Sequence, residues 1–291
     1  TWNGQGRNEI VLSHEIRFPH SLGLLYSAFT AFLGFEVNEG EYKVMGMAPY
    51  GQPKHLDRVA EILHVERDGS FSLDLDYLSY HYSDRDSFSR KFVRLFGEPR
   101  VPESEFYTRS SGLPADYDRR RLEANEYYAD VAASIQRATE DALLAMARRL
   151  YEETGLARLC LAGGVAYNSV ANGRLLRETP FEELYVQPAA GDSGGAVGAA
   201  LYAYHVLLQR PRAFVMDHAY WGAGWSSRDI EEALTRRGVA FEHFDRDEDL
   251  LDEVAGALAE GTVVGWFQGR TEWGPRALAT GASWRTPGGP R

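Results

Sequence analysis

Two glycine-rich turns constrain the fold most, because each stands between a short apolar run and a helical pattern. The first turn follows residues 159–162 and reads Gly-Gly-Val-Ala-Tyr-Asn over residues 163–168. The second follows residues 183–187 and reads Gly-Asp-Ser-Gly-Gly over residues 191–195. A strand, a tight turn and a helix whose first amides point back at the turn are typical of nucleotide-binding α/β proteins. The tandem arrangement therefore predicts an α/β fold with buried strands and a nucleotide site.

Three residues of these turns are candidates for ligand contacts. Gly163 and Gly164 carry no Cβ, so a phosphate or ribose can approach their backbone closely. Asp192 follows the second predicted strand, where open α/β sheets place their ligands. Asp192 can equally be the N-cap of a helix that we expect over residues 194–208. The pattern alone leaves both interpretations of Asp192 open.

Composition narrows the class of protein. The chain has 291 residues, of which 44% are hydrophobic, and a formal net charge of -11. This acidic balance argues against nucleic acid as the main partner. Cys160 is the single cysteine and falls in a predicted buried strand, which excludes internal disulfides and favours a reducing cytoplasm. No apolar span reaches the roughly 20 residues that would cross a membrane, so we expect no membrane association.

Periodicity predicts further elements along the chain. We expect a strand over 9–17, a helix from an N-cap at Ser21 through Leu33, a shaped loop over 39–51, a strand-like piece over 70–75 and a helix over 125–153. After a connector at 209–218, we expect a helix opened by Ser226 and Asp229, a strand over 239–244, a helix over 248–260 and a strand over 262–267.

Basic side chains in two glycine-rich segments are candidate anion ligands. Lys43, in the predicted loop, can pair with a phosphate or be an ordinary surface lysine. Arg270 and Arg276 offer paired guanidinium groups for an anion such as phosphate. Glu272 lies between them, so the same residues can instead form a structural salt-bridge cluster.

Five blocks, in this order, resemble one known family. They read Phe-Pro-His-Ser-Leu-Gly-Leu-Leu-Tyr over 18–26, Gly-Glu-Tyr-Lys-Val-Met-Gly-Met-Ala-Pro-Tyr-Gly over 40–51, Leu-Ala-Gly-Gly-Val-Ala-Tyr-Asn over 161–168, Gly-Asp-Ser-Gly-Gly-Ala-Val-Gly-Ala-Ala over 191–200 and Gly-Trp-Phe-Gln-Gly-Arg-Thr-Glu-Trp-Gly-Pro-Arg-Ala-Leu over 265–278. Together they resemble the O-carbamoyltransferases of the NodU/CmcH type.

The resemblance implies an actin/hexokinase-like (ASKHA) α/β domain followed by a YrdC-like α/β domain. In this chain it implies a truncated first domain over 1–210, a linker over 211–225 and an incomplete second domain over 226–291. The YrdC-like domain is expected to make carbamoyl adenylate from carbamoyl phosphate and ATP with Mg²⁺. The first domain is expected to transfer the carbamoyl group to a hydroxyl of a sugar or natural product, at a site holding a divalent metal, expected to be iron(II).

The resemblance also implies roles for individual residues. The nucleotide contacts would be Gly163, Gly164, Val165 and Asn168, and the metal ligand would be Asp192. Lys43 and Tyr50 would be catalytic residues near the cleft. Arg270 and Arg276 would hold carbamoyl phosphate or the ATP phosphates. The acceptor and the oligomeric state are not indicated, and we expect the acceptor-discriminating pocket within residues 54–123.

Two departures from the family pattern matter. The 291 residues contain no His-x-x-x-His pair, which in the family completes the metal site. Residues 279–284 read Ala-Thr-Gly-Ala-Ser-Trp where the family has Gly-Asn-Arg-Ser-Ile-Leu. We therefore expect a fragment that cannot complete turnover by itself.

Three other interpretations stay open. A threonylcarbamoyl-adenosine enzyme acting on tRNA has the same domain type, although the acidic charge and the block at 18–23 argue against it. A non-catalytic nucleotide-binding remnant would bind ATP without carbamoyl transfer. An α/β domain with purely structural glycines would bind no nucleotide at Gly164.

Overall fold

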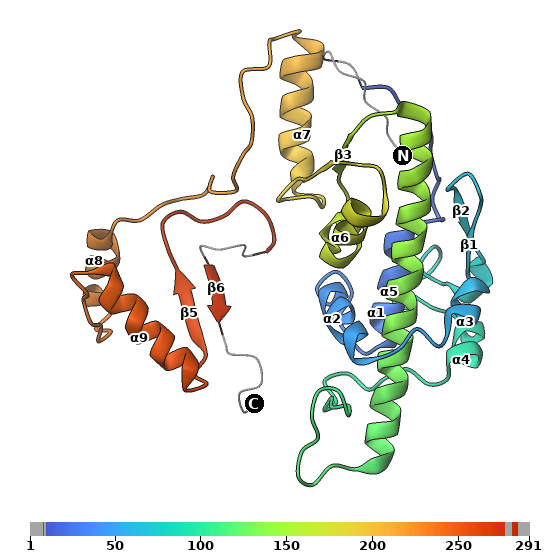
Figure 1. Cartoon of the computed structure of the whole chain (residues 1–291), viewed down its shortest axis with the longest axis horizontal. Coiled ribbons are helices and arrows are strands. Elements are labelled where there is room, and N and C mark those ends of the chain that lie inside the picture. The colour runs from blue at the N-terminus through green and yellow to red at the C-terminus, as the bar shows by residue number, and fades with distance from the viewer. Residues whose placement is uncertain (1–7, 9, 277–280, 285–291) are drawn as a thin grey trace. The chain divides into compact units, whose positions relative to one another are not determined.

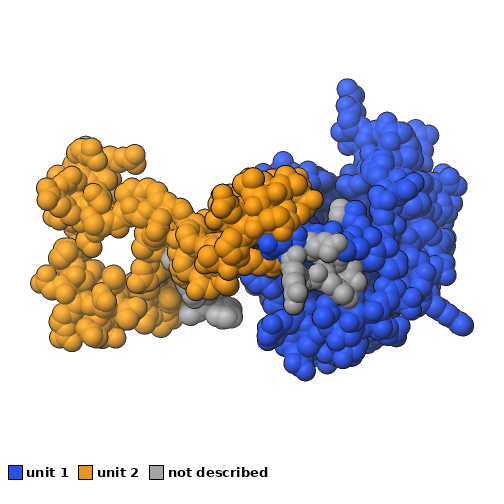
Figure 2. All heavy atoms as spheres, turned by 90° about the horizontal axis from the view of Figure 1, so that it is seen from above, with its two compact units in different colours: residues 1–186 blue, residues 187–291 orange. Residues whose placement is uncertain are grey.

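The computed structural model describes Asn8, residues 10–276 and residues 281–284. The chain forms two compact units, residues 1–186 and 187–291 (Figures 1 and 2). Within the described residues the strands form three two-stranded sheets, so the mixed α/β class predicted from the sequence is confirmed. No helix in the described ranges is long and apolar enough to cross a membrane. The domain boundaries at residues 210 and 225 stay predictions.

The elements of unit 1 are α1 (Leu22–Phe32), α2 (Glu41–Met47), the 3₁₀ turn η1 (Ala48–Tyr50), α3 (Leu56–Ala60), β1 (Leu63–Val65), β2 (Phe71–Leu73), the 3₁₀ turn η2 (Leu75–Tyr77), α4 (Arg90–Phe96), α5 (Arg119–Thr154), β3 (Arg158–Leu161), the 3₁₀ turn η3 (Gly164–Tyr167), α6 (Ser169–Glu178) and β4 (Glu183–Val186). The elements of unit 2 are α7 (Gly194–Tyr202), the π-helical η4 (Ala203–Leu207), α8 (Ser227–Arg236), α9 (Asp247–Ala259), β5 (Val264–Phe267) and β6 (Gly281–Trp284).

Helix α5 is the axis of unit 1 (Figure 1). Its 36 residues span about 54 Å at the α-helical rise. It begins at Asp118, whose side chain accepts the Arg121 amide, and ends at Gly155 in the left-handed conformation, as helices commonly do. The predicted helix over 125–153 is therefore confirmed, and the structure extends it by six residues at its start.

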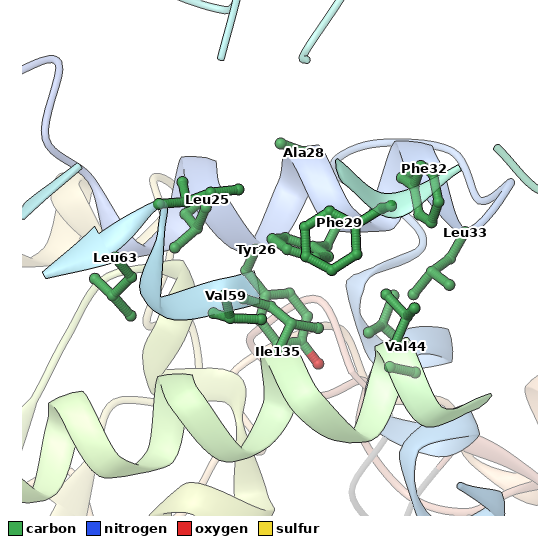
Figure 3. Close-up of a cluster of buried hydrophobic side chains, with 14 of the residues drawn as sticks. Leu25, Tyr26, Ala28, Phe29, Phe32, Leu33, Val44, Val59, Leu63 and Ile135 are labelled. Atoms are coloured by element: carbon green, nitrogen blue, oxygen red, sulfur yellow. The ribbon is translucent and has the colours of Figure 1, made fainter. Parts of the chain in front are cut away.

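An aromatic and aliphatic core covers one face of α5. Phe29 and Phe32 of α1 meet Phe92 and Phe96 of α4 edge to face, with ring centroids 4.9–6.0 Å apart. Such geometries add about 0.5–1.5 kcal/mol per pair beyond the burial of apolar area. Figure 3 shows Phe29 among side chains that come from several other helices, including Ile135 of α5.

The chain after η1 is fixed against α5 by polar contacts. The carboxylate of Asp130, which is 8% exposed, accepts the Gln52 amide at 2.7 Å and pairs with the Lys54 ammonium at 2.8 Å. The hydrogen bond to Asp130 raises the pKa of Lys54. Ser134, one turn further along α5, accepts the His55 amide at 3.0 Å. This segment is therefore held in register by side chains of α5.

The first predicted strand–turn–helix unit is confirmed. β3 pairs in parallel with β4, with Leu159 opposite Leu184, and α6 connects them in sequence. The expected burial of this strand is wrong in part: only Leu159 of β3 is buried, and Cys160 is exposed. Side chains alternate between the faces of a strand, and in unit 1 one face of β3 packs on α5 and α6 while the other is open.

The predicted loop over 39–51 is wrong, because it folds as α2 followed by η1. The residues that usually break helices lie where a helix tolerates them. Gly40 precedes the first turn of α2, Pro49 stands in the first turn of η1, and Gly51 ends η1. Glu41 fixes the start of α2 by accepting the Asn38 amide and the Ser27 hydroxyl.

Two predicted strands are also wrong. Residues 12–17 have no regular structure, with a single bridge residue at Val11, and Ile10 and Leu12 are 52% and 54% exposed. Residues 239–244 have no regular structure either. A strand exists only where a neighbour supplies ladder hydrogen bonds, and alternation of apolar residues does not provide that neighbour.

In unit 2, the predicted helices and the strand after residue 262 are confirmed as α8, α9 and β5. Ser226 and Asp229 form the capping box of α8. The alternative role of Asp192 as a helix N-cap is wrong, because α7 begins after Ser193 and has no side-chain cap. The exposed Asp192 carboxylate therefore has no part in starting this helix.

Two glycines of the segment 46–51 give a matched test of the packing against α5. A Cβ on Gly51 would lie 2.1 Å from the Ala129 carbonyl carbon and oxygen, whereas a Cβ on Gly46 would meet nothing within 4 Å. We expect Gly51→Ala to lower the free energy of unfolding by about 1–3 kcal/mol or more. Gly46→Ala should raise it by about 0.5–1 kcal/mol through helix propensity. Urea denaturation of both variants checks this, and equal stabilities would contradict the close approach of η1 to α5.

Candidate functional site

The turn between β3 and α6 is the first element of the candidate site. Gly163 has φ +94°, a backbone conformation that residues other than glycine rarely adopt. The Ala166 amide donates to the Gly163 carbonyl at 3.0 Å, which starts η3, and Asn168 then caps α6 by accepting the Ala171 amide at 3.1 Å. The Asn172 amide group donates to the Ala166 carbonyl at 2.8 Å and closes the turn.

Both glycines of the turn face open space. A Cβ placed on Gly163 or Gly164 would meet no atom within 4 Å. Gly163 is explained by its positive φ, but the φ of Gly164 lies outside that region. Neither backbone conformation nor packing therefore requires glycine at 164, which leaves the approach of a ligand as a physical reason for it.

Asn168, by contrast, is buried and tied into the core of unit 1. It is 9% exposed and exchanges two hydrogen bonds of 3.0 Å with Gln136 of α5. Gln136 also accepts the Tyr26 hydroxyl at 2.8 Å and donates to Glu140 at 2.7 Å. The turn is thus connected through one buried polar network to α1 and α5.

An arginine from α6 completes this network. Arg174 binds Glu140 at 2.7 Å and Asp141 at 3.0 Å, and contacts Glu178 through two parallel hydrogen bonds of 2.6 and 2.8 Å. The hydrogen bonds to Glu178 raise the pKa of Arg174 further, and the bond to Arg174 lowers the pKa of Glu178. The ion pairs therefore hold α6, and the turn at its start, against α5.

A groove of about 440 Å³ adjoins the same turn. Val165 of η3 lines it together with Gly23 of α1, and a Cβ on Gly23 would lie 3.4 Å from the Val165 side chain. His20 and Ser21 also line the groove, and the His20 Nδ1 accepts the Leu73 amide at 3.1 Å. The sequence block over 18–26 therefore forms part of the surroundings of Val165.

Lys43 and Tyr50 lie on α2 and η1 and are exposed. The Lys43 Nζ lies 5.9 Å from the Phe35 ring centroid and 6.0 Å from that of Tyr42, while the Tyr50 ring meets Phe106 at 5.9 Å. Their catalytic roles stay predictions.

Nothing in the sequence indicates that Met45 of α2 lies near the glycine turn. Its sulfur lies 3.7 Å from the hydroxyl of Ser169, the first residue of α6. Helix α2 therefore reaches the end of the glycine turn, a contact between segments more than 120 residues apart that carries no local sequence signal.

Asp192 belongs to unit 2. Within the described residues, no group of three or more histidine, cysteine, aspartate or glutamate side chains is arranged to hold a metal ion. One exposed carboxylate does not make a metal site, since a divalent cation needs several ligands at once. The role of Asp192 as a metal ligand stays a prediction.

Arg270 is anchored to residues 211–225, which are predicted to be a linker. Its Nε donates to the Gly222 carbonyl at 2.9 Å, and the backbones of Gly222 and Ala223 pair with that of Thr271. A Cβ on Gly222 would lie 2.0 Å from the Thr271 hydroxyl, so glycine is required there. Arg276 is half-buried further along the same loop. Phosphate binding by both arginines stays a prediction.

The sequence places this chain in a known family. Residues 2–201 match the family described as the carbamoyltransferase N-terminus. Since this match covers more than half of the chain, the chain belongs to that family, as the sequence blocks predicted.

Individual relatives support this assignment. An uncharacterized protein of Synechocystis sp. is 48% identical over 284 residues, which are 95% of this chain and 43% of the relative. The nodulation protein NolNO of Sinorhizobium fredii is 36% identical over 265 residues, 90% of this chain and 34% of the relative. A 3'-hydroxymethylcephem-O-carbamoyltransferase of Amycolatopsis lactamdurans is 33% identical over 129 residues, 41% of this chain and 21% of the relative. This chain spans less than half the length of each of them.

The ion pairs of Arg174 give a test of the network under the turn. Arg174→Met would leave Glu140 buried without its cation, and we expect a loss of about 3 kcal/mol in the free energy of unfolding. The exposed partner has a smaller role, because solvent screens its charge, so Glu178→Gln should lower the free energy of unfolding by much less than Arg174→Met.

This test also has a pH dependence with a defined sign. Arg174 lowers the pKa of Glu178 from its ordinary value of 4.5, so their pairing stabilises the folded state above pH 4.5 and is lost as the pH falls. The stability difference between the parent and Arg174→Met should therefore narrow on acidification. Urea denaturation at pH 7 and pH 3 measures it, and a difference that widens at pH 3 would contradict the network.

Proposed function

We propose that this chain forms part of an O-carbamoyltransferase that moves a carbamoyl group from carbamoyl adenylate to a hydroxyl of a small molecule. Carbamoyl phosphate and ATP with Mg²⁺ would supply the adenylate in the cytoplasm. Membership of the carbamoyltransferase family supports the transfer, and the name of the Amycolatopsis relative specifies a hydroxymethyl acceptor on a cephem. The net charge of -11 favours a small acceptor, such as a sugar or natural product, over nucleic acid.

The proposed domain assignment follows the same family. Residues 1–210 would be the actin/hexokinase-like part that transfers the carbamoyl group, and residues 226–291 would begin the YrdC-like part that makes the adenylate. The parallel pairing of β3 with β4 and the family match over residues 2–201 support the first assignment.

The proposed reaction forms one bond and breaks one. The acceptor hydroxyl oxygen attacks the carbamoyl carbon, the bond from that carbon to the phosphate oxygen breaks, and AMP leaves while the hydroxyl proton passes to a base. In this chain the turn from Gly163 to Asn168 would bind the nucleotide, with Lys43 and Tyr50 beside the cleft. The guanidinium groups of Arg270 and Arg276 would bind phosphate oxygens through charge-assisted hydrogen bonds.

A divalent metal, iron(II) by family resemblance, enters this proposal only through Asp192. Since no group of three or more histidine, cysteine, aspartate or glutamate side chains in the described part of the chain is arranged to hold a metal ion, Asp192 would need further ligands that this group of residues does not supply. No step of the proposed reaction is therefore assigned to a metal.

One observation carries the nucleotide part of the proposal. Gly164 is exposed, its φ is not positive, and a Cβ there would touch nothing in the protein. The fold itself therefore tolerates a side chain at 164, whereas a phosphate or ribose lying against this backbone would not.

The matched pair Gly164→Val and Gly256→Val tests this assignment. A Cβ on Gly256, in α9, also meets nothing within 4 Å, so both variants should keep the parent's circular dichroism and melting temperature. Titration calorimetry with ATP and with a non-hydrolysable carbamoyl adenylate analogue measures binding. We expect Gly164→Val to weaken binding at least about 10-fold, equivalent to ~1.4 kcal/mol, and Gly256→Val to leave it unchanged.

Other outcomes reject the proposal. Equal affinities for the parent and Gly164→Val would show that no nucleotide lies against the backbone of Gly164. A parent chain that binds neither ligand would remove the nucleotide site from this turn.

A further inference from the structure

The reciprocal contact between Gln136 and Asn168 is the direct link from α5 to the glycine turn. Gln136 is 5% exposed and Asn168 is 9% exposed, so both amides are largely shielded from water. Each side chain donates one hydrogen bond of 3.0 Å to the other. Two buried amides paired in this way restrict each other's orientation.

The orientation of both amides follows from partners whose own polarity is fixed. Asn168 must turn its oxygen toward the Ala171 backbone amide, which can only donate. Gln136 must turn its nitrogen toward the Glu140 carboxylate, which accepts at 2.7 Å. Asn168 therefore presents its nitrogen, and not its oxygen, on the side of the amide away from the helix cap.

Counting the hydrogen bonds shows what Asn168 can still offer. Its oxygen already accepts from Gln136 and Ala171, which uses both lone pairs. Its nitrogen carries two hydrogens and donates one to Gln136. Among the described residues, no partner takes the second hydrogen.

We propose that Gln136 is a positioning residue that holds Asn168 as a hydrogen-bond donor to an oxygen of the bound nucleotide. This inference rests on the proposed nucleotide site at the turn. Gln136 acts through Asn168 and does not itself contact the ligand. Without Gln136, Asn168 would keep its bond to the Ala171 amide but lose the partner that restricts its nitrogen, which would cost nucleotide affinity as well as stability.

The network supplies a control that separates positioning from stability. Tyr26 donates to the same oxygen of Gln136 that accepts from Asn168, but it takes no part in the contact between the Gln136 nitrogen and Asn168. Tyr26→Phe removes that bond but leaves the Gln136 nitrogen between Asn168 and Glu140. It should lower the urea concentration at the midpoint of unfolding and leave nucleotide affinity unchanged.

Gln136→Met and Asn168→Asp are the test variants. Gln136→Met keeps the length of the side chain and removes its hydrogen bonds, and we expect ATP affinity to fall about 10-fold. Asn168→Asp keeps the oxygen that caps α6 but loses both N–H donors, and should lose at least as much affinity. Titration calorimetry with ATP measures affinity, and urea denaturation measures stability.

The side-chain amide resonances of Asn168 report on the inference directly. Their assignment follows from their loss in Asn168→Asp. On addition of ATP, we expect one of the two Nδ2 protons to shift strongly while the proton bonded to Gln136 moves little. This readout does not depend on whether Gln136→Met folds.

The outcomes distinguish this inference from the proposed function. If the parent binds ATP and Gly164→Val weakens binding, the nucleotide site stands. An unchanged affinity in Asn168→Asp, unmoved Asn168 protons, or equal affinity losses in Tyr26→Phe and Gln136→Met would then overturn the role of Gln136 alone. A parent that binds no ATP overturns both.

Discussion

Unit 1 depends on how α5 pairs the polar side chains that it buries. The apolar stripe of α5 provides most of the burial, but burial is not directional and does not choose a register. The buried polar side chains fix the register, because hydrogen bonds are directional. Asn125 donates to the carbonyls of Glu105 and Tyr107, Asp130 accepts from Gln52 and Lys54, and Gln136 pairs with Asn168. Each of them would carry a desolvation penalty of about 1–3 kcal/mol without its partner, so each fixes one distant segment in place.

The two neighbouring glycines of the turn have different causes, although the sequence presents them as one motif. Glycine is needed at 163 because of the backbone conformation there: a positive φ lets the chain leave β3 and enter η3 within one residue. Gly164 has ordinary backbone and no close neighbour. Gly163 is therefore needed for the fold, whereas we assign Gly164 to ligand binding. Only a substitution at 164 tests ligand binding without also disturbing the fold.

Local signals could be predicted from the sequence and non-local ones could not. The caps of α1 at Ser21 and of α8 at Ser226 are contacts over three residues, so their residue types alone indicate them. The pairing of Gln136 with Asn168 joins residues 32 apart, and that of Asp130 with Gln52 joins residues 78 apart. The prediction of a loop over residues 39–51 is wrong for a related reason. Gly40, Pro49 and Gly51 are typical of loops, and only their places at the ends of α2 and η1 make them compatible with helices.

Unit 2 shows how a segment without regular structure can still have a defined role. The family resemblance predicts that residues 211–225 are a linker between two domains. Yet the Gly222 carbonyl binds the Nε of Arg270 at 2.9 Å, and the backbone pairing with Thr271 fixes that carbonyl. With its Nε occupied, Arg270 keeps two terminal nitrogens that bond no group in the described part of the chain, and they form one edge of a planar fork. A linker that only joined two domains would tolerate side chains, but Gly222 has no room for a Cβ. Gly222 and Ala223 are therefore fixed against the segment that carries Arg270 and Thr271.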